Sequence, residues 1–246
     1  MVNELFTMLG AGIVGYAGYG IIEAVKDVRS YYKATLEEEY RVSIEEPVIS
    51  SHELVLGYKQ FGGYRKPIIA DMQKMPHVLV CGLSRQGKTK MIEYSIQNKN
   101  VILLNTDKRD FPCVKCERIN DIKEIEVVLQ KLVEIQENNE PVYVVIDEIL
   151  ALIKSGSGKK IMDLITQLLA VGSHKNIYVI AITQCAEKEI VNNKHLYNIR
   201  VCFKMLDESA YKVVLGKAPE DLYLCNRQFY YITDEIGTGY TYDVGK

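Results

Sequence analysis

The sequence lacks a large excess of charge of either sign. Its 246 residues include 30 lysines and arginines against 32 aspartates and glutamates, so the formal net charge is −2. Nucleic-acid binding depends on clustered basic residues that release counterions. Binding through a high overall positive charge is therefore excluded, and any contact with nucleic acid must use a local patch or an assembled ring.

Internal repeats are absent, and proline is scarce, with six residues in the chain. Hydrophobic residues make up 48% and charged residues 25%, which excludes disordered and collagen-like classes and is typical of a globular protein. The length suits one large domain, or one domain with an appendage.

The six cysteines are scattered, and only Cys113 and Cys116 form a C-x-x-C pair. A second pair at zinc-ligand spacing is missing, so the usual four-cysteine zinc site is not indicated. Several cysteines lie in apolar runs, which favours a reducing compartment. A metal or redox role for Cys113 and Cys116 is the alternative to ordinary loop or core cysteines.

The segment Leu5–Ile22 contains no charged residue and nearly matches the thickness of a hydrocarbon core. No positive residue precedes it, which argues against a cleavable signal peptide. Lys26, Arg29 and Lys33 follow it, so the positive-inside tendency places the rest of the chain in the cytoplasm. We expect residues 1–25 to form a membrane anchor helix; the alternative is a glycine-rich helix or loop docked on the soluble domain.

Residues 26–50 are rich in charge, a pattern that indicates a solvated helix or linker outside the core. From residue 51 to 246, apolar runs alternate with helical stretches, a pattern typical of an α/β domain with a mostly parallel sheet covered by helices. We expect strands at 77–81, 101–104, 142–146, 177–182 and 199–205, helices at about 88–97, 121–136 and 159–170, and short strands within 222–243.

One motif follows directly after the first of these strands. Residues Gly82-Leu83-Ser84-Arg85-Gln86-Gly87-Lys88-Thr89 fit the phosphate-binding pattern G-x-x-x-x-G-K-[ST], and Lys90 comes next. In such a loop the backbone N–H groups and the dipole of the following helix hold phosphates. Lys88 is expected to reach the terminal phosphates and the Thr89 hydroxyl to bind Mg²⁺. The sequence therefore predicts a nucleoside triphosphate site over residues 82–90.

Two acidic residues end the apolar strand 142–146. At this position a carboxylate can bind Mg²⁺ and its neighbour can polarise the attacking water, so we assign Asp147 to the metal and Glu148 to the general base. The alternative is that both acids only cap the next helix.

The next strand ends in Thr183 and Gln184. The Gln184 amide can bond both the γ-phosphate and the lytic water, which suits a sensor of nucleotide state. The alternative is a polar turn residue.

Together these segments resemble the motor domain of the FtsK/SpoIIIE DNA translocases. The run Ala70–Gly82 is similar to that family's "AD..KMPHLLVAG", and Asp107-Lys108 to its "DPK" step. Residues 146–148 and 181–184 resemble its "VDE" and "ATQ" elements, and 199–204 its "TRIAFRV" strand. The similarity covers about residues 54–215.

The resemblance implies a RecA-like fold, ATP with Mg²⁺ as fuel, and a homo-hexameric ring around double-stranded DNA. It predicts a membrane-anchored ATPase that moves DNA, in a short plasmid- or phage-type member. Two alternatives stay open: a conjugation or phage-assembly motor acting on single-stranded or packaged DNA, and an ATP-dependent membrane scaffold with little turnover. The chain departs from the family at Gln86, where a glycine is usual, and at Cys185-Ala186, where arginine and proline are usual.

A ring motor also needs a positive group from the neighbouring subunit to meet charge on the γ-phosphate. Arg200 and Arg85 are the candidates, and the alternative for each is a surface arginine. A basic loop with Lys154, Lys159 and Lys160 is a candidate for contacts with DNA phosphates, or else a solvated loop without a partner.

Overall fold

The computed structural model describes residues 49–61, 64–105, 107, 109–186, 193–219 and 222–242. The described residues from 49 to 61 and from 67 onward belong to one compact unit. The predicted anchor helix and nearly all of the charged linker therefore lie outside the described residues. Within the described part, no helix is both long and apolar enough to cross a bilayer.

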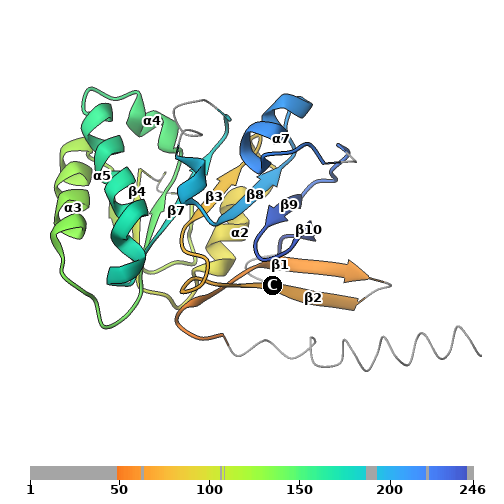
Figure 1. Cartoon of the computed structure of the whole chain (residues 1–246), viewed down its shortest axis with the longest axis horizontal. Coiled ribbons are helices and arrows are strands. Elements are labelled where there is room, and N and C mark those ends of the chain that lie inside the picture. Colours follow the sequence, from red (N-terminus) through yellow and green to blue (C-terminus); the bar gives the residue numbers. More distant parts are fainter. Residues whose placement is uncertain are drawn as a thin grey trace, which may run out of the picture. The chain divides into compact units, whose positions relative to one another are not determined.

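A ten-stranded sheet runs through the fold, in the spatial order β2-β1-β10-β9-β8-β3-β7-β6-β4-β5 (Figure 1). The strands are β1 (Glu53–Phe61), β2 (Tyr64–Asp71), β3 (Val78–Cys81), β4 (Val101–Leu104), β5 (Glu117–Ile119), β6 (Val142–Ile146), β7 (Ile177–Thr183), β8 (Ile199–Phe203), β9 (Gln228–Ile232) and β10 (Ile236–Tyr240).

The sheet has a parallel half and an antiparallel half. Strand β3 is parallel to both β7 and β8, and β6 is parallel to β7 and β4. The pairs β8–β9, β9–β10 and β10–β1 are antiparallel. The carboxyl ends of β4, β6, β7 and β3 therefore share one edge of the sheet, where α/β proteins bind their ligands.

Helices cover the parallel half on both faces. One face packs under α3 (Ile122–Glu134), α4 (Ile149–Ile153), α5 (Gly158–Val171) and α7 (Glu208–Leu215), and α2 (Lys88–Ser95) packs on the other. Helices α3 and α4 both contact α5, and the three appear together in green in Figure 1. Strands buried on both faces read as continuous apolar runs, which is why the sequence pattern located them.

The predicted α/β class with a sheet flanked by helices is confirmed, and the sheet is mixed because an antiparallel half adjoins the parallel one. The strands at 101–104 and 142–146 have the predicted bounds, and the helices differ by one or two residues at their ends. The strand expected at 199–205 ends at Phe203, because the Lys204 carbonyl turns to accept a hydrogen bond from Leu83 N, 3.0 Å away. Strands β1, β2 and β5 were not predicted.

Candidate nucleotide-binding site

The loop 82–87 leaves β3 and curls into the start of α2 through two glycines. Gly82 and Gly87 have φ values of 150° and 112°. A Cβ on Gly82 would lie only 2.5 Å from the Cβ of Phe203, a distance that side chains do not tolerate. The close approach of β8 and the positive φ values together require glycine at both positions.

Lys88 begins α2 directly after the loop. Its Nζ donates to the carbonyl oxygens of Gly82 at 2.7 Å and Leu83 at 2.9 Å, and the residue is only 7% exposed. Burial lowers the pKa of Lys88, and the carboxylates of Glu148 and Asp147 act in the opposite direction. The ammonium group is thus held inside the loop by carbonyl groups that a bound phosphate could replace.

Asp147 and Glu148 follow β6, which is separated from β3 by β7 alone. Burial, aided by the nearby carboxylates of Asp110 and Glu148, raises the pKa of Asp147 to about 6, against the opposing effect of Lys88. A partly buried carboxylate among like charges gains most from a bound cation.

Glu148 has a positive φ of 51° and no side-chain capping bond to α4. Its Oε1 instead lies 3.3 Å from the Thr183 Oγ1 and 3.5 Å from the Gln184 N–H nitrogen. Thr183 has one hydroxyl proton and also lies 3.1 Å from the Cys185 carbonyl oxygen, so it can donate to only one of these acceptors at a time. The capping alternative is thus not supported for Glu148, whose carboxylate faces the end of β7.

Gln184 meets the phosphate loop directly, because β7 lies between β6 and β3. The Ser84 hydroxyl donates a hydrogen bond to Gln184 Oε1. The structure therefore brings the predicted sensor into contact with the loop and places its backbone beside Glu148.

The donors near the loop fit a magnesium ion chemically. Thr89 is half-buried in the first turn of α2, and Asp147 is half-buried at the end of β6. Hydroxyl and carboxylate oxygens are the ligands that Mg²⁺ takes, usually with several waters and phosphate oxygens. In the part of the chain that the structure describes, no group of three or more His, Cys, Asp or Glu residues could hold a metal alone.

Three further residues of the predicted site, Arg85, Gln86 and Lys90, lie in different surroundings. Arg85 is exposed with a φ of 61°, whereas Gln86 is absent from the residues with positive φ. Gln86 therefore occupies the usual glycine position without left-handed strain. Lys90 is exposed on α2 and forms a 2.7 Å ion pair with the fully buried Glu93.

The two candidate trans arginines have different surroundings. The Arg200 side chain is half-buried on β8, where its Nη1 donates to the Val214 carbonyl oxygen at 3.2 Å and burial lowers its pKa. Arg85 is exposed on the phosphate loop. Arg200 is thus bound within its own chain, and which of the two acts in trans stays a prediction.

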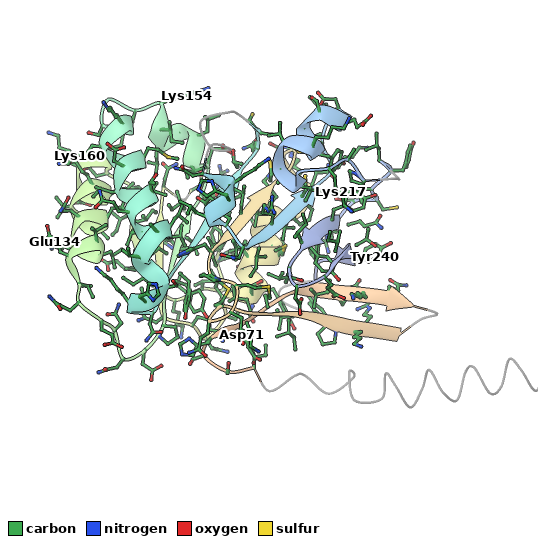
Figure 2. All side chains as sticks on the ribbon, viewed as in Figure 1. Asp71, Glu134, Lys154, Lys160, Lys217 and Tyr240 are labelled. Carbon is green, nitrogen blue, oxygen red and sulfur yellow. The ribbon has the colours of Figure 1, made fainter. Side chains whose placement is uncertain are left out.

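The basic loop is shorter than predicted, because α5 begins at Gly158 and takes in Lys159 and Lys160. Lys160 pairs with Glu126 of α3, while Lys154 lies exposed between α4 and α5 (Figure 2). The contact of this basic loop with DNA phosphates stays a prediction. Cys113 is exposed and Cys116 half-buried, and both are free thiols.

Sequence reasoning missed Asn105, which directly follows β4. Its Nδ2 donates to the Asp147 carbonyl oxygen at 2.9 Å, and its φ is 57°. Asparagine is among the few residues that adopt this left-handed conformation readily. The sequence signal that could have identified Asn105 is the one that identified Asp147: a polar residue directly after an apolar strand.

No protein-family model matches the chain, and no curated protein matches it. Solved structures do. The pCW3 conjugation coupling protein TcpA, in a monomer form with ATPγS, superposes with a TM-score of 0.66 at 18% identity, over 82% of this chain and 68% of its own.

Two further structures share the architecture. For EssC (ATPases 2 and 3) from Geobacillus thermodenitrificans, the TM-score is 0.61 at 12% identity, over 78% of this chain and 44% of that one. For the genome packaging NTPase B204 from Sulfolobus turreted icosahedral virus 2, in complex with AMPPCP, it is 0.53 at 12% identity, over 68% of this chain and 98% of that one. The chain therefore spans less than half of the solved EssC chain. At these identities the similarity shows the fold alone: an α/β fold with a mixed central sheet flanked by helices.

Proposed function

We propose that this protein is an ATP-hydrolysing motor that moves DNA. The observation that carries the proposal is the convergence of four groups from three neighbouring strand ends: Lys88 after β3, Asp147 and Glu148 after β6, and Gln184 after β7. Hydrolysis requires a phosphate cradle, a charged clamp and a positioned water, and these strands supply groups of each type.

The chain's own residues have separate roles in this proposal. The loop amides and Lys88 bind the phosphates, and Thr89 with Asp147 would hold Mg²⁺, which neutralises charge on the phosphate oxygens when bound. Glu148 accepts the proton of the attacking water. Gln184 orients that water and passes the state of the γ-phosphate to the segment that follows β7.

The assignment to DNA rests on the FtsK-like motifs and on structural likeness to a conjugation coupling protein and a genome packaging NTPase. We further propose a homo-hexameric ring around double-stranded DNA, tethered to the membrane by residues 1–25 with the motor in the cytoplasm. The ring would supply the arginine in trans and the local basic surface that a net charge of −2 does not provide.

A conjugation or phage-assembly motor is the second candidate, and the likeness to TcpA favours it. The two candidates differ in substrate, double-stranded against single-stranded or packaged DNA. A scaffold that binds ATP without turnover is the third, and Glu148 argues against it because such a protein needs no general base.

A single assay separates these functions. ATP hydrolysis by the full chain is measured alone, with double-stranded DNA and with single-stranded DNA, at low and at physiological salt. Stimulation by double-stranded DNA that declines with salt supports the proposal. Stimulation by single-stranded DNA alone supports the second candidate. Equal hydrolysis without DNA contradicts a DNA motor, and absent hydrolysis supports the scaffold.

A further inference from the structure

The phosphate loop divides the carboxyl-end edge of the sheet into two sides. On one side lie β7, β6 and β4, whose ends carry Gln184, Glu148 and Asp147. On the other side lie β8, β9 and β10. In a nucleotide whose γ-phosphate faces Glu148, the nucleoside is at the opposite end of the phosphate chain, and the β8–β10 side of the loop is the side away from Glu148.

Two residues of the antiparallel half reach this edge. Arg227 directly precedes β9 and Thr241 directly follows β10. The register Tyr240↔Gln228 places the start of β9 beside the end of β10, so the two residues are neighbours. Thr241 N donates to the Arg227 carbonyl oxygen at 3.0 Å. Because β9 is antiparallel to β8, with Phe203 opposite Phe229, both residues lie at the end of β8 that adjoins the phosphate loop.

Both side chains pack against the loop itself. A Cβ placed on Gly87 would lie 3.4 Å from Cγ of Arg227 and 3.5 Å from Cγ2 of Thr241. Gly87 immediately precedes the phosphate-binding Lys88. The pair therefore borders the loop at the residue where the helix begins, on the side away from Glu148.

Each residue also has a property that packing alone does not explain. Arg227 is exposed and has a φ of 66°, a left-handed conformation that is uncommon outside glycine, costs free energy and recurs at active sites and ligand clamps. Thr241 is 4% exposed, and its Oγ1 has no hydrogen-bond partner among the described residues. A buried hydroxyl without a partner is unfavourable unless a ligand or an ordered water completes its hydrogen bonding.

We propose that Arg227 and Thr241 form the subsite for the nucleoside of the bound nucleotide. The inference rests on the proposed ATP-binding function and names the residues that recognise the part of the ligand beyond its phosphates. The planar guanidinium of Arg227 suits stacking on a purine ring. The Thr241 hydroxyl can donate to or accept from a ribose hydroxyl or a base edge.

The test compares ATP with inorganic tripolyphosphate, which lacks the nucleoside, in binding assays on the full chain. We expect Arg227→Ala and Thr241→Val each to weaken ATP binding about five-fold or more, and to leave tripolyphosphate binding unchanged. Lys131→Ala, at an exposed position on α3, is the control and should change neither. Equal loss of both ligands, or loss of neither, would overturn the subsite.

Two further measurements separate recognition from folding. Thr241→Val replaces a hydroxyl that has no described partner by a methyl group of similar size, so its melting temperature should equal or exceed that of the wild type while ATP binding falls. Arg227→Lys keeps the aliphatic stem that packs on Gly87 but loses the planar fork, so it should resemble Arg227→Ala in ATP binding and the wild type in stability. A Thr241→Val protein that loses stability and keeps ATP affinity would contradict the proposal.

The wild-type protein distinguishes this inference from the proposed function. ATP binding tighter than tripolyphosphate binding, without hydrolysis, would contradict the motor and support the subsite. If the protein hydrolyses ATP but binds ATP and tripolyphosphate with equal affinity, the result would support catalysis and overturn the subsite.

Discussion

The Ser84 hydroxyl donates a hydrogen bond to Oε1 of Gln184, which joins the phosphate loop to the end of β7 across 100 residues of sequence. The Gln184 N–H nitrogen lies 3.5 Å from Glu148 Oε1. One residue thus contacts both the loop that binds phosphate and the candidate base. This arrangement makes Gln184 the structural connection between nucleotide binding and the chemistry after β6.

That connection predicts coupled effects of Ser84→Ala and Gln184→Ala on ATP hydrolysis. Each variant should lower kcat, Gln184→Ala by about 10- to 100-fold, because the amide no longer orients the water. The double variant should lose less than the product of the two, with a coupling of about 0.5–3 kcal/mol in a double-mutant cycle. Steady-state ATPase assays with parallel nucleotide binding measure this. Independent, additive effects would mean that the contact has no role in turnover.

The second prediction concerns the buried charge of Asp147. Its pKa in the folded protein is about 6 against an ordinary 3.8, so between these values the folded state binds more protons than the unfolded state. Stability therefore falls as pH rises through this window, and the penalty is complete above about pH 6. At 1.36 kcal/mol per pKa unit it amounts to at most about 3 kcal/mol, and less because Asp147 is only half-buried.

Asp147→Asn should accordingly stabilise the metal-free, nucleotide-free protein at pH 7.5 while abolishing Mg²⁺-dependent hydrolysis. The gain in unfolding free energy should shrink toward zero near pH 4, where the wild-type carboxyl is also neutral. Denaturant unfolding in EDTA at the two pH values measures both effects. A variant that is less stable at pH 7.5 would contradict the role of Asp147 as a strained metal ligand.

The sequence predicted the parts of this site that depend on local pattern. The phosphate loop 82–89 and the strand 142–146 were located because a glycine motif and a continuous apolar run can be recognised in the sequence alone. Gln184 was identified because it ends such a strand. Its bond to Ser84 was not predicted, because a contact between residues 84 and 184 depends on the strand order β3-β7-β6.

Other elements gave weak or misleading signals. Strand β5 has only three residues, Glu117–Ile119, and β1 mixes charged and polar residues with apolar ones, so neither forms a continuous apolar run. Arg200 was selected because the strand at 199–204 resembles a family strand that begins with arginine, and its role in trans stays a prediction. Its bond to the Val214 carbonyl depends on how α7 packs on β8, which no local pattern encodes.

Asn105 provides the third prediction. Its side chain supports the Asp147 backbone from β4, so Asn105→Asp should remove the Nδ2–H donor while keeping a residue type that tolerates the left-handed φ of 57°. We expect kcat to fall about ten-fold and ATP affinity to change little, because the phosphate loop is untouched. Asn105→Gly is the matched control for backbone strain and should show a similar loss. If both variants hydrolyse ATP at the wild-type rate, the bond does not position Asp147.

The fourth prediction separates binding from chemistry with two variants of the same site. Glu148→Gln preserves the size of the side chain and an oxygen that can face Thr183, but it removes the base, so ATP should still bind while hydrolysis falls about 100-fold or more. Lys88→Ala removes the ammonium that now bonds Gly82 and Leu83, so it should lose ATP affinity itself. Nucleotide binding and single-turnover hydrolysis on the two proteins give the comparison. Because the Glu148 carboxylate is the feature that distinguishes a motor from a nucleotide-dependent scaffold, near-normal turnover by Glu148→Gln would remove the main argument for a hydrolytic role of this strand end.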